Sequence, residues 1–202
     1  IIDMPVAETS GDNVTYSTTP LGIIITEKNV ITVCTRGNPV LDEFTDGAVK
    51  GVQTNLKTRF ILHLMLRIAT KYLQYLKQID KLSSHVEREL RKSMKNSELI
   101  QLLDIEKSLV YFSSSLKGSE ITIEKTSRGR VVKLYEEDQD LLEDVLIEVR
   151  QAIEMSSIYL NILSGTMDAF ASVISNNLNI VMKVLASITL IISIPTVISS
   201  FY

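Results

Sequence analysis

The chain has 202 residues, of which 45% are hydrophobic and 22% are charged, and its formal net charge is −3. This length suits one globular domain with a buried core. The nearly balanced charge argues against a disordered polyampholyte and against a nucleic-acid-binding protein, which carries a basic excess. The single cysteine excludes an internal disulfide framework and a cysteine-based zinc finger, and two histidines leave little for a histidine-rich metal site. The mean hydropathy of +0.17 is high for a soluble protein, because apolar residues are concentrated near the C-terminal end.

Residues 1–51 contain the β-branched runs and the Gly, Pro and Thr residues that separate strands. Two runs, residues 22–26 and 30–34, flank a polar Glu-Lys-Asn segment and predict a β-hairpin. Residues 13–16 indicate a weaker strand, and Ile1-Ile2 predicts the end of another. Cys34 falls in a predicted strand, where we expect a small, buried, apolar side chain.

From about residue 54 to residue 95, apolar residues recur every three or four positions, which predicts a long helix. A second helix is expected from Glu98 to Leu116, antiparallel to the first and ended by Gly118. Residues 121–133 are ambiguous, and residues 127–130 predict an exposed loop.

A third helix is expected to begin near the acidic residues 136–138 and to continue to Tyr202, since Gly165 is not followed by a second helix breaker. Such a helix would be about 100 Å long, whereas the radius of gyration of a 200-residue domain is only about 17 Å. The sequence therefore predicts a stalk that projects from the domain.

The C-terminal segment, residues 184–202, contains no charged residue. A helix of this length spans roughly 28 Å, close to the hydrocarbon thickness of a bilayer. The alternative is a buried core helix, which would normally show one polar face. Pro195 is compatible with a membrane helix, and Lys183 at its entry predicts that residues 1–183 are cytoplasmic.

Small polar side chains precede the apolar segment at three- and four-residue spacing, so they share one helix face: Asn161, Ser164, Asp168, Ser172, Ser175 and Asn179. An ordinary solvent face is the alternative, but such a face is usually rich in Lys and Glu, which form helices better than Asn and Ser do. Small residues allow close helix packing, and their oxygen atoms can line a path for a hydrated cation. With one such helix per chain, that path needs several chains around an axis. Asp168, the one charged residue of this region, would attract cations.

The run Asn-Asn-Leu-Asn-Ile-Val-Met-Lys-Val-Leu at residues 176–185, with Ile194-Pro195-Thr196 and Phe201-Tyr202 after it, resembles the CorA family of divalent-cation channels. In that family an Asn-x-x-Met-Lys-x-Leu run leads into the first membrane helix, which ends in Tyr-Gly-Met-Asn. The present sequence stops at the Tyr. Residues 108–112 also resemble the helix that precedes the stalk in this family.

The resemblance implies an α+β fold, with an α/β/α-type N-terminal domain containing a β-sheet over residues 1–134. A stalk helix over 135–183 and the first membrane helix over 184–202 would follow. It also implies a homopentamer in the inner membrane that transports Mg²⁺, with Co²⁺ as the other candidate ion. Carried over by position, Asn179, Leu185, Ser193 and Thr196 would line the pore, with Leu185 in a hydrophobic gate. Asp168 would face the stalk axis.

Members of this family sense intracellular Mg²⁺ with carboxylates that lie between neighbouring cytoplasmic domains. The resemblance makes Asp144 the stalk candidate for such a regulatory metal site, with a partner among Asp42, Glu43 and Asp46. Bound Mg²⁺ would offset the repulsion between these carboxylates and hold the channel closed. A solvated acidic surface is the alternative interpretation.

The sequence is also compatible with two other functions: a zinc transporter of the same superfamily, and a membrane-tethered scaffold whose helices only oligomerise. An enzyme is not expected, because the sequence has no Gly-rich phosphate loop and no catalytic constellation. His63 and His85 are too far apart for an i, i+4 pair, and we expect them to be surface or interface residues.

Overall fold

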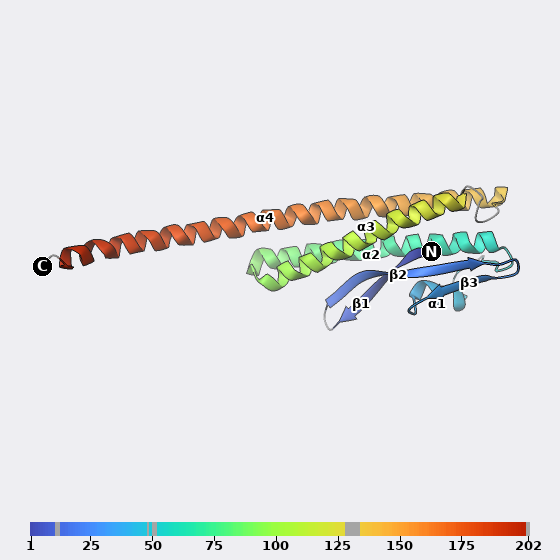
Figure 1. Cartoon of the computed structure of the whole chain (residues 1–202), viewed down its shortest axis with the longest axis horizontal. Helices are drawn as coiled ribbons and strands as arrows, with labels where there is room; N and C mark the ends of the chain where they lie inside the picture. Colours follow the sequence, from blue (N-terminus) through green and yellow to red (C-terminus); the bar gives the residue numbers. More distant parts are fainter. Residues whose placement is uncertain (11–12, 48, 50–51, 128–133, 201–202) are drawn as a thin grey trace. The chain divides into compact units, whose positions relative to one another are not determined.

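The computed structural model describes residues 1–10, 13–47, 49, 52–127 and 134–200 (Figure 1). It comprises two units, Ile1–Leu163 and Ser164–Tyr202. The elements in chain order are β1 (Ile2–Ser10), β2 (Asn13–Ile25), β3 (Val30–Cys34), α1 (Pro39–Thr45), α2 (Lys57–Ser93), α3 (Asn96–Ser127), a 3₁₀ turn (Glu136–Asp138) and α4 (Gln139–Ser200). A three-stranded sheet followed by helices and one long C-terminal helix confirms the predicted fold class.

The strands form an antiparallel sheet in the order β1-β2-β3, with Leu21 opposite both Ile2 and Cys34. The predicted hairpin is confirmed, but residues 13–16 and 22–25 belong to one strand, β2, rather than two. Pro20 is tolerated inside β2 because it lies one residue beyond the pairing with β3, where its missing N–H interrupts no ladder on that side. The expectation of a buried Cys34 is wrong: its side chain is half-buried on an outer strand, and its Sγ lies 2.9 Å from the carbonyl oxygen of Arg36.

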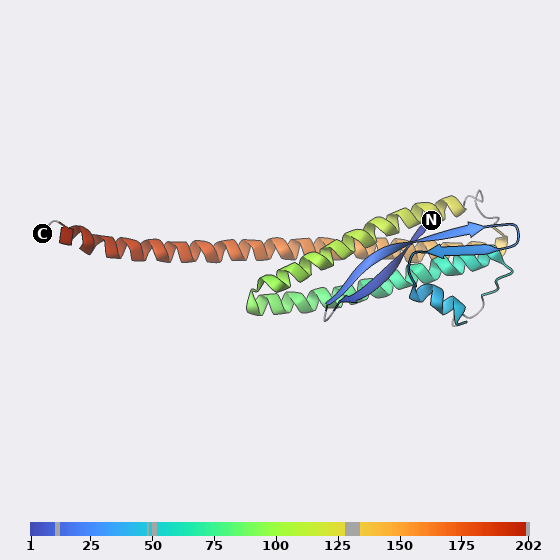
Figure 2. The ribbon, with the colours of Figure 1, turned by 60° about the horizontal axis from the view of Figure 1, so that its bottom comes forward.

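Helices α2 and α3 form an antiparallel hairpin that packs on the sheet (Figure 2). Helix α2 ends at Ser93 and is capped by Met94, whose φ of 49° is left-handed and whose amide donates to the carbonyl oxygen of Leu90 at 2.9 Å. This bond satisfies one of the free carbonyl groups at the end of the helix and turns the chain into α3.

The core of the first unit is an aromatic cluster between the sheet and this helical hairpin. The ring of Tyr72 lies 5.0 Å from that of Phe112, and the ring of Tyr16 lies 5.4 Å from that of Tyr75, centroid to centroid. The hydroxyl of Tyr72 donates to the carbonyl oxygen of Asp3 at 3.1 Å. Burial raises the pKa of this phenol, so the group stays neutral and keeps its donor role.

The prediction that Gly118 ends the second helix is wrong, because α3 continues to Ser127. Leu116 and Ile123, on either side of Gly118, are both fully buried, and Thr122 donates to the carbonyl oxygen of Gly118 at 3.0 Å. The packing of these apolar side chains outweighs the roughly 1 kcal/mol by which glycine is a poorer helix former than alanine. Residues 121–127 of the ambiguous segment are therefore helical, including Ser127 at the start of the predicted loop, and residues 128–133 lie outside the described residues.

Helix α4 has 62 residues and runs through both Gly165 and Pro195, which confirms the predicted absence of a stop signal. At 1.5 Å per residue its length is roughly 93 Å. Within the first unit it buries an apolar stripe at three- and four-residue spacing, formed by Leu142, Val145, Val149 and Ala152, and Leu163 is buried further along. The proposed division of this helix into stalk and membrane segments at residue 184 stays a prediction.

Candidate functional site

The second unit consists of the C-terminal part of α4 and contains the apolar segment. Within the described residues, α4 is the one helix whose length and hydropathy suit a membrane span. The apolar side chains here are exposed, with Leu190 and Ile191 each 67% accessible. A water-exposed surface of this kind is unfavourable, and a bilayer would cover it.

The predicted pore residues share one face of this helix. At 100° per residue, Asn179, Leu185, Ser193 and Thr196 fall within an arc of roughly 120°. Asp168, which lies nearer the N-terminal end of α4, falls on the same arc, and Ser172 lies roughly 20° beyond its edge. The helix thus places the acidic side chain, the amide and the hydroxyls on one continuous face.

The hydroxyl groups of this face are held by the helix backbone. Ser193 donates to the carbonyl oxygen of Thr189 at 2.7 Å, and Thr196 donates to that of Ile192 at 2.5 Å. Ser172 donates to the carbonyl oxygen of Asp168 at 3.0 Å. Because each hydroxyl hydrogen is used in this way, the oxygen lone pairs are left to accept hydrogen bonds from other groups. Waters around a metal ion are donors of that type.

Thr189 is a candidate functional residue that the sequence reasoning missed. It lies four residues before Ser193, so it falls on the same arc, and its hydroxyl donates to the carbonyl oxygen of Leu185 at 2.8 Å. Extending the polar spacing of residues 161–179 by helical periodicity would have found it. The hydroxyl of Thr189 places another neutral oxygen on this face, between the predicted gate at Leu185 and the hydroxyl of Ser193.

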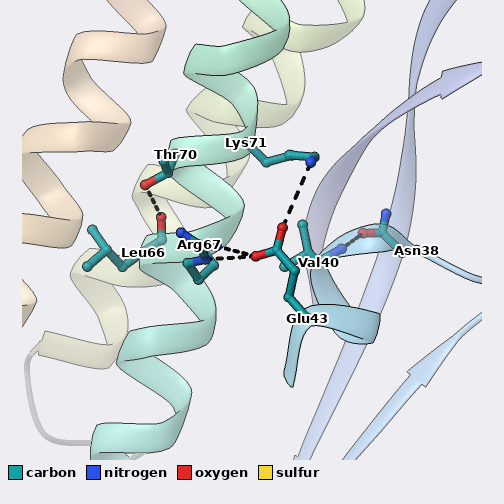
Figure 3. Close-up of polar contacts among 7 residues, drawn as sticks. All are labelled: Asn38, Val40, Glu43, Leu66, Arg67, Thr70 and Lys71. Atoms are coloured by element: carbon teal, nitrogen blue, oxygen red, sulfur yellow. Dashed lines mark hydrogen bonds and ion pairs between the residues drawn. The ribbon is translucent and has the colours of Figure 1, made fainter. Parts of the chain in front are cut away.

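Glu43 of α1, one of the three candidates for the partner of Asp144, is engaged by basic side chains of α2 (Figure 3). Arg67 donates to its Oε2 from Nε at 2.9 Å and also from Nη2, and Lys71 Nζ lies 3.9 Å from its Oε1. Lys71 also lies over the ring of Tyr75, 5.5 Å from its centroid. The charge of Glu43 is therefore compensated inside one chain.

The other acidic candidates are more accessible. Asp42 and Asp46 are exposed at α1, and Asp144 is exposed on α4. The described residues contain no group of three or more His, Cys, Asp or Glu side chains that could hold a metal ion. A carboxylate site in this part of the chain would therefore need ligands from a second subunit or from water molecules. His85 is exposed and His63 is half-buried, and burial beside Arg59 lowers the pKa of His63.

Comparison with known proteins identifies a family and a fold. The family model described as CorA-like Mg²⁺ transporter protein matches residues 2–202. The chain is 26% identical over 142 residues to the cobalt/magnesium transport protein CorA of Methanocaldococcus jannaschii, a match that covers 70% of this chain and 45% of that protein. The chain thus spans about half the length of this curated relative.

Two solved structures from the same organism share the fold. The complete structure of its CorA magnesium transporter has a TM-score of 0.72 at 20% identity, with 98% of this chain and 68% of that chain covered. The soluble domain of its CorA has a TM-score of 0.69 at 22% identity, with 82% and 72% covered. At these identities the structures establish the fold, and the family model establishes the membership: the chain belongs to the CorA-like Mg²⁺ transporter family.

Proposed function

We propose that this protein is a subunit of a divalent-cation channel that passes Mg²⁺, with Co²⁺ as a second ion, across the inner membrane. The observation that carries the proposal is the continuous polar face of α4, which extends from Asp168 through Asn179 to Thr196. Membership of a transporter family supports transport rather than catalysis. Residues 1–183 would be cytoplasmic, with Lys183 at the membrane entry.

The chemistry of this face suits a hydrated ion. Mg²⁺ releases its waters reluctantly, so a rapid path must accept hydrogen bonds from those waters instead of replacing them. Asn179, Thr189, Ser193 and Thr196 provide amide and hydroxyl oxygens for that purpose. A pore requires several copies of α4 around one axis, and we propose the homopentamer that the family resemblance implies.

Two other residues have distinct parts in the proposed path. Asp168 is exposed and lies sixteen residues before Val184, roughly 24 Å along the helix, where a ring of carboxylates would concentrate cations. Leu185 is an apolar residue on the same face, and a ring of such side chains closes a narrow pore by excluding water.

We also propose that the cytoplasmic part senses Mg²⁺ through Asp144 and a carboxylate of a neighbouring subunit. Among the acidic residues of α1, Asp42 is the better partner, because Arg67 and Lys71 already compensate the charge of Glu43. An exposed carboxylate that faces a second one is repelled by it until a divalent cation binds both. High internal Mg²⁺ would therefore hold neighbouring subunits together and favour the closed state.

The test is Mg²⁺ flux into liposomes that carry the full-length protein and an enclosed Mg²⁺-sensitive dye. Asn179→Leu should abolish most of the flux, because it removes an oxygen atom from the proposed path and narrows it. Asn177→Leu is the matched control, since it makes the same change on the opposite face of α4 and should leave flux near the wild-type rate. Absence of Mg²⁺ and Co²⁺ flux in the wild-type protein would favour a tethered scaffold.

The alternative is a zinc transporter, and a path in which Zn²⁺ exchanges its waters for protein ligands is disfavoured by the ligand set of this face. Zn²⁺ sites in proteins use Cys and His as well as carboxylates, whereas the face between Asp168 and Thr196 offers oxygen donors and no His or Cys. Flux of Zn²⁺ in preference to Mg²⁺ in the same liposomes would reverse this assignment.

A further inference from the structure

Two apolar ridges lie on the outer faces of α3 and α4 within the first unit. On α3, Ile121 is 55% exposed, although the residues two positions before and after it, Ser119 and Ile123, are buried. On α4, Ile147 is 55% exposed between the buried residues Val145 and Val149. Two residues correspond to about 200° around a helix, so the buried neighbours lie on the side of the helix opposite to each exposed isoleucine. Each ridge therefore points away from the core of its own subunit.

Each ridge continues along its helix. Val110 of α3 is 46% exposed and Ile162 of α4 is 60% exposed. The two ridges also carry exposed charges of opposite sign at one level, Lys117 on α3 and Glu154 on α4, while the exposed Arg150 of α4 is paired with glutamates of α3 in its own chain. The two surfaces are therefore complementary in charge, and both present apolar side chains that a single subunit leaves in water.

The ion pairs of Arg150 fix the register of the two helices. Arg150 of α4 donates from Nε to Glu120 at 2.8 Å and from Nη2 to Glu124 at 3.0 Å, both on α3. The helices run in opposite directions and cross at a shallow angle (Figures 1 and 2). Residue 150 thus lies level with residues 120–124. Twelve residues further along α4, roughly 18 Å, is Ile162, and the same distance back along α3 is Val110, so these two residues lie at about the same level.

The same register places Glu154 level with Lys117, and it places Ile147 within about one helical turn of Ile121. Cyclic symmetry moves a subunit around an axis without shifting it along that axis. For an axis that runs along these helices, residues level within one subunit are also level between neighbours. The ridge of α3 in one subunit therefore meets the matching residues of α4 in the next.

We infer that these ridges form the contact between neighbouring subunits, with the occupant of each ridge a second copy of this chain. The inference rests on the ring assembly proposed above. The contact joins two different surfaces, which is the arrangement that generates closed rings. It assigns three pairs across the interface: Val110 with Ile162, Lys117 with Glu154, and Ile121 with Ile147.

Cysteine cross-linking of the full-length protein tests the register. In a Cys34→Ser background, the double variant Val110→Cys with Ile162→Cys should form a ladder of covalent oligomers on mild oxidation. The matched control is Val110→Cys with Ile147→Cys, because Ile147 is displaced from Ile162 by roughly 22 Å along α4 and should give several-fold less product. An equal ladder in both variants, or a cross-link confined to single chains, would overturn the inference.

A charge reversal tests the polar pair by a different readout. Lys117→Glu should reduce the fraction of assembled oligomer in detergent several-fold, because it places two acidic groups opposite each other. Adding Glu154→Lys should restore the oligomer, which a merely structural role of either residue would not. Failure of the rescue, or a protein that is monomeric throughout, contradicts the proposed contact. A protein that assembles as described but passes no cations contradicts only the transport proposal.

Discussion

Arg67 on α2 donates to the same carboxylate oxygen of Glu43 on α1 from both Nε and Nη2, so Glu43 acts as an internal tie between two helices. We expect Glu43→Gln to leave the Mg²⁺-dependent rise in melting temperature unchanged while lowering the melting temperature itself. Asp42→Asn should reduce the Mg²⁺-dependent rise and leave the melting temperature without Mg²⁺ unchanged, since Asp42 is exposed and would bind an ion rather than a neighbouring helix. Thermal unfolding of the oligomer with and without Mg²⁺ checks both. Loss of the Mg²⁺ shift in Glu43→Gln alone would reassign the sensing carboxylate.

Asp144 is the stalk residue of the proposed sensor, and its replacement by Ala should weaken the stabilisation of the oligomer by Mg²⁺. Without Asp144 the bound cation has one negatively charged ligand fewer. The facing carboxylate is also no longer repelled when Mg²⁺ is absent, so binding of the ion relieves less repulsion. Asp140→Ala provides a control on the same helix, because Asp140 is also exposed. A melting shift that is equally large in Asp144→Ala and in the wild type would remove Asp144 from the mechanism.

His63 should make the stability of the protein depend on pH around and below the ordinary histidine pKa of 6.5. Burial and the nearby Arg59 lower its pKa below the ordinary value of 6.5, so the unfolded chain binds a proton that the folded chain does not. Stability is then full above the unfolded pKa and falls as pH decreases through it. His63→Gln should flatten this dependence, because it removes the titrating imidazole. Melting temperatures measured across this pH range provide the comparison.

Tyr72 and Tyr16 allow a matched test of the core. Tyr72→Phe removes the hydrogen bond from a fully buried tyrosine to the carbonyl oxygen of Asp3 and should cost about 1–2 kcal/mol of unfolding free energy. Tyr16→Phe removes a bond of similar length, 3.1 Å, to Gln78, whose side chain is exposed and can bind water instead. Its cost should be clearly smaller. Equal costs in chemical denaturation would mean that water reaches both acceptors.

Much of the fold was predictable because helical periodicity is a local property of the sequence. Local sequence patterns predict the helix α2, the uninterrupted helix α4 and the hairpin at residues 22–34. Gly118 misled the interpretation because its local preference opposes the helix, while the burial of Leu116 and Ile123 depends on contacts with other elements. Residues 13–25 form one strand for a similar reason: pairing along the whole of β1 outweighs the local effect of Pro20.

The site was less predictable wherever it depends on distant contacts. The compensation of Glu43 requires Arg67, which is 24 positions away in sequence, and no spacing rule links the two. Thr189, in contrast, follows from the same periodicity that defined the polar face. It was missed because the pore residues were carried over from a family resemblance instead of being extended along the helix.

Thr189 gives the sharpest test of the path itself. Thr189→Val keeps the shape of the side chain but replaces the hydroxyl by a methyl group, so it removes one acceptor for the waters of a passing ion. One hydrogen bond of about 0.5–1.5 kcal/mol corresponds to a reduction in Mg²⁺ flux of roughly 2- to 12-fold, while Thr189→Ser should preserve the rate. Ser187→Ala is the control, because Ser187 also donates to a helix carbonyl, that of Lys183 at 2.9 Å, but lies outside the polar arc. If Ser187→Ala slows Mg²⁺ flux in liposomes as much as Thr189→Val does, the hydroxyls act by supporting the helix and not by contacting the ion.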